Sequence, residues 1–230
     1  MHFIAQLIFL IVFVAAVWTF ILSIRTIRSN IFMGRDWEPQ GTPAQRWRNM
    51  FRVALGQGKM GSRPLAAFFH VIVYAGFILI NIEVLEIFID GLFGTHRVLS
   101  ILGPLYDVAI GFFEVLVLLV IIACTVFLLR RYVFKVKRLS HPDLEGFANR
   151  DAATILCIEI VLMSALLFMN AADFKLQEKG IEHYFKAGSF PVSQYVSMLF
   201  YHGAPVSNLI MTERFMWWLH LIGILLFMNY

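Results

Sequence analysis

The sequence has little charge and almost no cysteine. Asp, Glu, Lys and Arg make up 15% of its 230 residues, whereas hydrophobic residues make up 60% and are arranged in long runs. This composition excludes an ordinary soluble domain and indicates an integral membrane protein. The two cysteines, Cys124 and Cys157, lie in apolar stretches and form no C-x-x-C pair. The chain therefore cannot by itself hold an iron–sulfur cluster or a structural zinc, and we interpret both cysteines as small apolar residues.

Five apolar stretches predict an all-α integral membrane fold, a bundle of five transmembrane helices. The first has no positively charged start and no small-residue cleavage site, which indicates a retained helix rather than a signal peptide. The last would cover only about 24 Å as a helix, against a hydrocarbon core of about 30 Å. We therefore expect the chain to be the front part of a longer polypeptide. The predicted spans are 3–24, 65–89, 104–129, 152–172 and the incomplete 214–230.

Basic residues are concentrated in two of the four connecting loops, between the first and second spans and between the third and fourth. The other two loops have little net positive charge. The positive-inside rule then predicts an N-terminus outside, both basic loops in the cytoplasm and a cytoplasmic C-terminus. The basic residues are Arg25, Arg28, Arg35, Arg46, Arg48, Arg52, Lys59 and Arg63 in the first loop, and Arg130, Arg131, Lys135, Lys137, Arg138 and Arg150 in the second.

Two loops carry helical patterns of their own. In "GTPAQRWRNMFRVALGQGK", within the cytoplasmic loop 30–64, Thr42 is the predicted N-cap and Pro43 the first helical residue. Apolar residues between Trp47 and Leu55 follow helical spacing beside arginines. This predicts a basic amphipathic helix on the membrane surface, or a docking face for a partner. In the outer loop 173–213, "FPVSQYVSMLFYHG" is too short to span and predicts an interfacial or re-entrant segment.

Only two of the seven histidines, His70 and His220, lie within predicted spans. Ionisable residues inside a membrane are costly and are usually functional. One interpretation is an imidazole hydrogen-bonded to a neighbouring backbone, and the other is an axial haem ligand, because a neutral imidazole binds iron. The second and fifth spans run antiparallel, so we expect these histidines at different depths and on different irons. A partner for His70 on the fifth helix would fall beyond residue 230.

The five-span pattern resembles the cytochrome b subunit of respiratory nitrate reductase and the related membrane subunit of heterodisulfide reductase. In that family, histidines on the second and fifth spans hold two b haems stacked across the membrane. The stretch "FFHVIVYAGF" is similar to the start of the second span, which implies that His70 is the ligand nearer the cytoplasm. The stretch "WWLHLIGILLF" is similar to the start of the fifth span, which implies that His220 is the ligand nearer the outside.

The sequence departs from this family at the expected partner of His220. The family's other second-span ligand falls where this chain has Ile80 and Asn81. His96 and His202, both predicted on the outer side, are candidate replacements, and the alternative is that they are ordinary loop histidines.

The stretches "NIEVLEIFIDGLFGTHR" and "RNMFRVALGQGKM" also resemble the membrane part of bacterial iron–sulfur oxidoreductases of the heterodisulfide-reductase type. This resemblance implies a multi-pass protein of the bacterial inner membrane. It also implies a cytoplasmic module with two [4Fe–4S] clusters on the same polypeptide, after residue 230.

Four glutamates in the spans are candidates for proton transfer linked to quinone chemistry, which exchanges two protons per quinone. Glu83 and Glu86 share one stripe near the outer end of the second span, pointing away from His70, with Glu114 near the middle of the third span and Glu159 in the fourth. For Glu83 and Glu86 the alternative is simple proximity to the membrane interface. For Glu114 it is a structural hydrogen bond.

Together these features predict a membrane component of a quinone-linked oxidoreductase. One or two b haems would pass electrons between membrane quinone and the cytoplasmic iron–sulfur module. The alternative is a haem-free membrane anchor or proton-conducting bundle for a soluble redox module. Lipid, quinone and the iron–sulfur module are the expected partners, and nucleic acid is not, because the arginines lie where membrane topology requires them.

Overall fold

The computed structural model describes residues 2–35, 40–57, 64–136 and 146–230. All regular structure among these residues is helical, and five helical stretches are long and apolar enough to cross a membrane. The predicted all-helical, five-span membrane fold is therefore confirmed. In chain order the elements are α1 (His2–Phe32), α2 (Pro43–Met50), the π-helical turn η1 (Phe51–Leu55), α3 (Pro64–Leu79), α4 (Asn81–Phe93), the 3-10 turn η3 (Val98–Leu102), α5 (Pro104–Tyr132), α6 (Phe147–Glu178), α7 (Ser193–Phe200) and α8 (Val206–Asn229).

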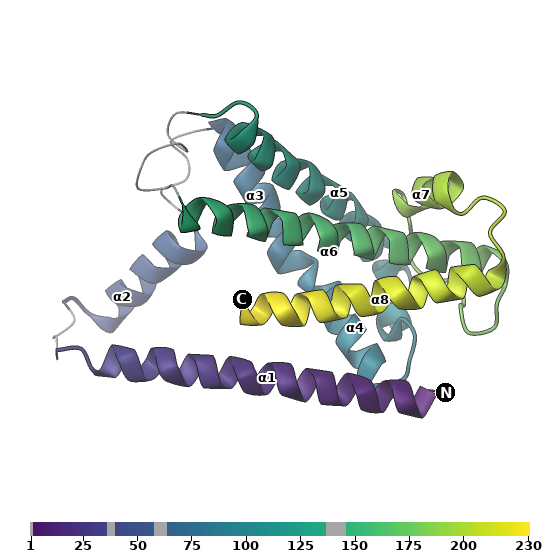
Figure 1. Ribbon diagram of the computed structural model, residues 1–230, viewed down its shortest axis with the longest axis horizontal. Coiled ribbons are helices and arrows are strands. Elements are labelled where there is room, and N and C mark those ends of the chain that lie inside the picture. The colour runs from purple at the N-terminus through teal and green to yellow at the C-terminus, as the bar shows by residue number, and fades with distance from the viewer. Residues whose placement is uncertain (1, 36–39, 58–63, 137–145) are drawn as a thin grey trace.

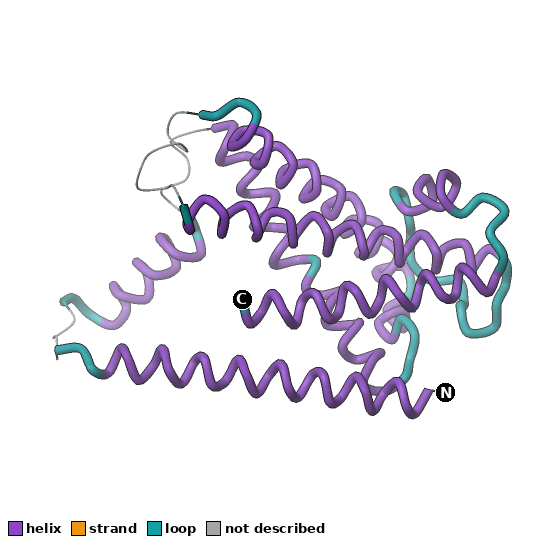
Figure 2. The backbone as a smooth tube through the Cα atoms, in the orientation of Figure 1, coloured by secondary structure: helices purple, strands orange, loops and turns teal. Residues whose placement is uncertain are grey.

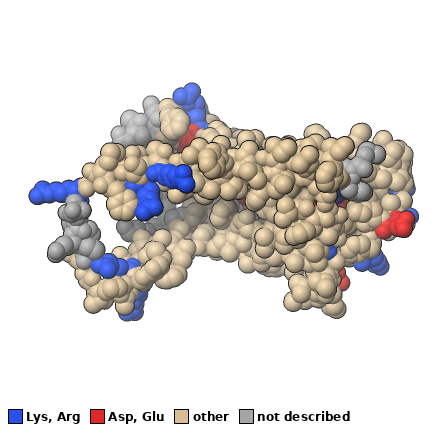
Figure 3. All heavy atoms as spheres, turned by 90° about the horizontal axis from the view of Figure 1, so that it is seen from below, with Lys and Arg blue, Asp and Glu red and all other residues tan. Residues whose placement is uncertain are grey.

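The long helices alternate in direction along the bundle (Figures 1 and 2). The N-terminus and the segments 94–103 and 179–205 lie at one end, which we call the N-terminal end, and α2 and the C-terminus lie toward the other. Most of the Lys and Arg visible in Figure 3 gather at the end that carries α2, as expected if both basic loops share one side of a membrane. That this side is the cytoplasm stays a prediction. Lys59, Arg63, Lys137 and Arg138 lie outside the described residues.

Helix α8 begins at Val206, eight residues before the predicted start of the fifth span. Hydropathy placed the start late because Glu213 and Arg214 interrupt the apolar pattern. In the structure the helix continues through these two residues, and their side chains bond each other. Its 24 residues cover about 36 Å, long enough to cross the hydrocarbon core.

The second span is divided into α3 and α4 at Ile80. The side-chain amide of Asn81 donates a hydrogen bond to the Phe77 carbonyl and so competes with the backbone bonds of the helix. Just before this break, α3 passes close to α5, because a Cβ added at Gly76 would lie only 2.4 Å from the Val120 side chain.

Helix α6 lies at the centre of the bundle and packs against α5, α7 and α8, with Leu166 in the middle of the core. Helix α1 is mostly exposed and joins the bundle at two places. Near its start, the Phe9 ring lies 6.0 Å from Trp217 of α8. Near the other end of α8, Asn229 donates to the Ala16 carbonyl and accepts from the Thr19 hydroxyl. The cavity described below lies close to the first of these two contacts.

The loop helix predicted after Thr42 is present. Thr42 caps α2 in a capping box with Gln45, and Pro43 is the first helical residue, as predicted. Neither α2 nor η1 has a buried residue. That this segment lies on the membrane surface or docks a partner stays a prediction. The segment "FPVSQYVSMLFYHG" forms the short helix α7, which lies on α6 through Ser193, whose hydroxyl donates to the Leu167 carbonyl.

Candidate functional site

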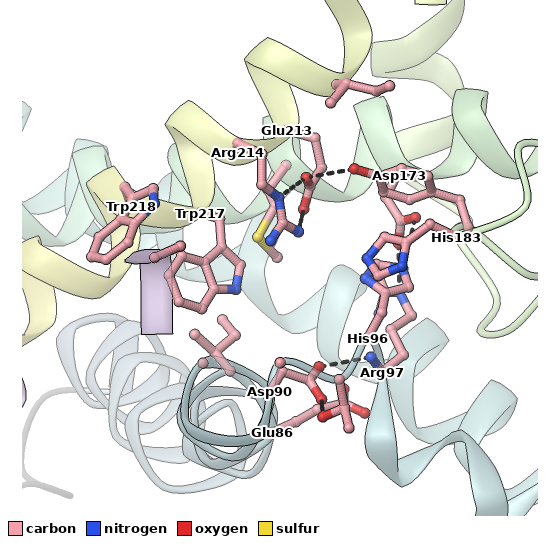
Figure 4. Close-up of a pocket in the computed structure, with 18 of the residues that line it drawn as sticks. Glu86, Asp90, His96, Arg97, Asp173, His183, Glu213, Arg214, Trp217 and Trp218 are labelled. Atoms are coloured by element: carbon pink, nitrogen blue, oxygen red, sulfur yellow. Dashed lines mark hydrogen bonds and ion pairs between the residues drawn. The ribbon is translucent and has the colours of Figure 1, made fainter. Parts of the chain in front are cut away.

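A cavity of about 530 Å³ lies at the N-terminal end between α1, α4, α6 and α8, and we call it the N-terminal cavity. Phe9, Trp217 and Trp218 give it an aromatic wall. Figure 4 shows the two tryptophans on one side, with His96 and Arg97 across from them. The cavity thus joins a flat apolar surface to a set of titratable groups, which is a common composition for small-molecule sites.

The titratable wall is built around Arg97, whose side chain is only 5% exposed. Its backbone is in the left-handed region, with φ +51°, and its N–H donates to Asp90 at 2.6 Å. The guanidinium donates to Asp173 at 2.5 Å, to Asn170 at 2.8 Å and to the Tyr106 hydroxyl at 3.0 Å. Burial alone would lower the pKa of Arg97, but the carboxylate of Asp173 reverses this and holds that pKa well above its ordinary value. Arg97 therefore remains a cation.

A second ion pair lies on the α8 side of the cavity. Glu213 bonds Arg214 and accepts a hydrogen bond from the Tyr184 hydroxyl at 3.1 Å. Burial and the neighbouring Glu213 raise the pKa of Tyr184. The guanidinium of Arg214 also lies over the Trp217 ring, 5.6 Å from its centre, which links the charged and aromatic walls.

The predicted acidic residues have different surroundings. Glu86 accepts from the Tyr106 hydroxyl and the Leu99 N–H, both at 2.8 Å, so neither oxygen is free. Glu83 is 2% exposed, and Asn170 donates to its Oε1 at 3.1 Å. Its Oε2 has no partner, and the residue lines the N-terminal cavity. Both glutamates are buried inside the protein, so proximity to the membrane interface does not account for them.

Glu114 and Glu159 lie outside the cavity lining. Glu114 accepts hydrogen bonds from the backbone N–H groups of Val192 and Ser193 at 2.9 and 3.0 Å, and so holds the start of α7 against α5. These bonds correspond to the structural role that the sequence analysis gives as the alternative to proton transfer at Glu114. Glu159 is half-buried on α6. Cys124 is buried and Cys157 exposed, both as free thiols.

His220 is fully buried on α8, one turn beyond Trp217. Its Nδ1 lies 2.8 Å from the Leu162 carbonyl oxygen, which can only accept, so Nδ1 carries the proton. Its Nε2 is buried without a partner among the described residues and therefore presents a lone pair. Metal-ligating histidines commonly have this arrangement, with one nitrogen oriented by a carbonyl and the other left for the metal.

The structure does not bring the other predicted histidines to His220. His96 lies at the cavity rim, its Nε2 3.2 Å from Asp173, and Asp173 and Leu162 are about 16 Å apart along α6. His202 is exposed in the turn before α8. His70 is half-buried near the opposite end of the bundle, next to Phe69, whose ring contacts Phe127 of α5. Among the described residues, no group of three or more His, Cys, Asp or Glu could hold a metal ion.

Sequence reasoning did not find Arg97 or the partners that surround it. In the sequence, Arg97 is a single basic residue in the short loop between the second and third spans. A signal was nevertheless present, because Asn170 and Asp173 interrupt the last apolar turns of the fourth span on one helical face. Polar residues inside a span usually have a polar partner, and Arg97 is the cation available nearby.

One curated protein is similar to the chain over nearly its whole length. It is the probable iron–sulfur-binding oxidoreductase FadF of Bacillus subtilis (strain 168), 28% identical over 224 residues, which are 97% of this chain and 30% of that protein. The chain therefore spans less than a third of the relative. No protein-family model matches the chain, and no solved structure gives a significant match.

Proposed function

We propose that the chain is the membrane electron-transfer part of a redox protein. A b haem with His220 as an axial ligand would exchange electrons with membrane quinone held in the N-terminal cavity. The observation that carries this proposal is the fully buried His220 with an unpartnered Nε2. A buried polar atom without a partner is costly unless something binds there.

The residues around His220 fit one axial position of a haem. A neutral imidazole oriented by the Leu162 carbonyl can bind iron without placing a net charge in the core. When bound, the haem supplies one-electron chemistry. His70, His96 and His202 lie away from His220, so we expect the second ligand from outside the described residues.

The N-terminal cavity fits a quinone head group in size and chemistry. Its volume of about 530 Å³ is within the range of small-molecule sites. Phe9, Trp217 and Trp218 offer a face for a flat ring, and Glu83 Oε2 offers a free polar atom. His220 follows Trp217 by about 4.5 Å along α8, so the two proposed sites are close enough for electron transfer.

The similarity to FadF supports a redox role for the chain and an iron–sulfur module as its electron-transfer partner. Because that relative is described as iron–sulfur-binding, we propose an iron–sulfur module as the partner that exchanges electrons with the haem. Its place on the cytoplasmic side follows from the predicted topology, as does the inner-membrane location. A separate ligand role for His70, nearer the basic end, would give the second haem.

A reduced-minus-oxidised absorption spectrum with pyridine haemochrome quantitation tests the proposal. Protein from haem-replete cells should show a b-type band that His220→Ala removes if one haem is bound and halves if two are bound. His220→Met should shift the band, while His202→Ala, an exposed position, leaves it unchanged. His70→Ala would halve the haem content if two haems are bound. A featureless spectrum of the wild-type protein would overturn the proposal and favour the haem-free anchor or proton-conducting bundle.

A further inference from the structure

Five carboxylates line the N-terminal cavity, and their hydrogen bonds separate one from the rest. Each of the other four has both oxygens engaged by protein donors or cations, whereas one oxygen of Glu83 has no partner among the described residues. The engaged residues are Glu86, Asp90, Asp173 and Glu213.

Glu83, the carboxylate with the free oxygen, lies deep in the bundle. Glu83 is the first of the three acidic residues along α4, and it lies closer to the middle of the bundle than Asp90, which organises the turn at the cavity rim. It is 2% exposed, so bulk solvent does not satisfy Oε2. A group that enters the cavity is the natural partner for this atom.

The neutral side chain of Asn170 connects Glu83 to the cation Arg97 and holds Glu83 in place. Asn170 donates to Glu83 Oε1 and accepts from Arg97, so the carboxyl orientation is fixed while Oε2 stays available. Arg97, Glu86 and Glu114 are the charged or titratable groups around it. Arg97 stays protonated beside Asp173, and Glu86 is fully hydrogen-bonded. Glu114 also has one oxygen without a partner among the described residues, but it lies outside the cavity lining. Of these groups, Glu83 is therefore the one able to change its proton at the cavity.

We propose that Glu83 is the residue that exchanges a proton with the quinone, and that this proton passes through the cavity to the N-terminal end. The inference rests on the proposed function and assigns its proton-transfer residue. Quinol oxidation releases two protons and two electrons. For each proton an O–H bond of the quinol breaks and an O–H bond forms at Glu83 Oε2, while the electron pair of the broken bond stays on the quinol oxygen, and Glu83 releases the first proton toward the N-terminal end before it takes the second. The two electrons would leave one at a time through a b haem, when it is bound, to the iron–sulfur module, and reduction of the quinone reverses these events.

The positions of Glu83 and His220 suit this division of roles. Their partners on α6, Asn170 and Leu162, are about 12 Å apart along the helix. A quinone between them could therefore face the electron ligand on one side and the proton acceptor on the other. From Glu83 the cavity continues to His96 and Asp173 at its rim, which gives the proton a polar route toward the N-terminal end.

Redox-induced infrared difference spectroscopy of the full-length protein, reconstituted with ubiquinone-1, tests the assignment. We expect the carbonyl band of a protonated carboxyl group to change on reduction in the wild-type protein. The band should be absent in Glu83→Gln, which keeps the side-chain shape and the bond to Asn170. Glu159→Gln is the matched control, since Glu159 lies on α6 outside the cavity, and it should retain the band.

A kinetic measurement on the same samples gives a second readout. Reduction of the haem by ubiquinol-1 should slow about 100-fold in Glu83→Gln, the range of general acid–base catalysis, with an unchanged b-type spectrum after dithionite. Retention of the infrared band, or a rate within threefold of wild type, would overturn the role of Glu83 while the haem band keeps the proposed function intact. A wild-type sample with no b-type band would overturn both.

Discussion

Replacement of Arg97 by methionine should destabilise the fold strongly. The change removes the cation but keeps an unbranched side chain of similar length. Asp173, 1% exposed, would lose its nearest cation, and Asn170 and Tyr106 would each lose a hydrogen bond. Removing one partner from a buried ion pair costs about 3–5 kcal/mol, because the other charge stays buried and uncompensated. We expect a loss in the free energy of unfolding of that size.

Equilibrium unfolding by SDS titration in mixed micelles would measure this loss. Lys175→Met is the control on α6, since Lys175 and Glu178 form an ion pair with side chains 27% and 45% exposed, and such pairs contribute about 0–1 kcal/mol. The double variant Arg97→Met with Asp173→Leu should recover most of the stability, because an apolar pair leaves no buried charge. The reasoning is refuted if Arg97→Met costs no more than Lys175→Met, or if the double variant is no more stable than the single one.

Two further predictions concern packing and pH. Gly91→Ala should cost about 1–3 kcal/mol in the same titration, because the added Cβ would lie 2.5 Å from the Phe9 ring where α1 meets α4. Burial raises the pKa of Tyr201 to about 12, above the value of about 10 in an unfolded chain, so its contribution to stability is complete below pH 10 and is lost as pH rises toward 12. Tyr201→Phe should make the loss of stability over this pH range shallower, and an unchanged slope would contradict the assignment.

The elements could be predicted from the sequence where the determining forces are local. Long apolar runs specify the five membrane helices, because every backbone group in a hydrocarbon core must be bonded within its own helix. The cap of α2 follows from three neighbouring residues, Thr42, Pro43 and Gln45, and the structure has it as predicted. For α7 the sequence predicts only a segment too short to span, and its helical structure is a finding.

The cavity could not be predicted because its bonds join residues far apart in the chain. Arg97 bonds Asn170 and Asp173, which lie more than 70 residues later in the chain. Its backbone has a left-handed φ that no local sequence pattern predicts. The start of α8 was misplaced for another reason. Hydropathy counts Glu213 and Arg214 as two charges that end an apolar run, whereas in the structure they bond each other within a continuous helix.

The polar groups of the bundle are distributed as the cost of burying charge requires. Arg97 with Asp173 and Glu213 with Arg214 lie toward the N-terminal end, and each buried charge has an opposite charge beside it. Deeper along α8 the polar group is a histidine, which can be neutral and satisfies one nitrogen with the Leu162 carbonyl. Glu83 lies between these two levels, and like His220 it keeps one buried atom without a partner. Four buried side-chain atoms of the described residues lack a partner, and the other two belong to Glu114 and Ser197, outside the cavity lining. Every other carboxylate of the cavity has both oxygens bonded, so we expect the chemistry at Glu83 Oε2, which can take a proton, and at His220 Nε2, which can bind a metal.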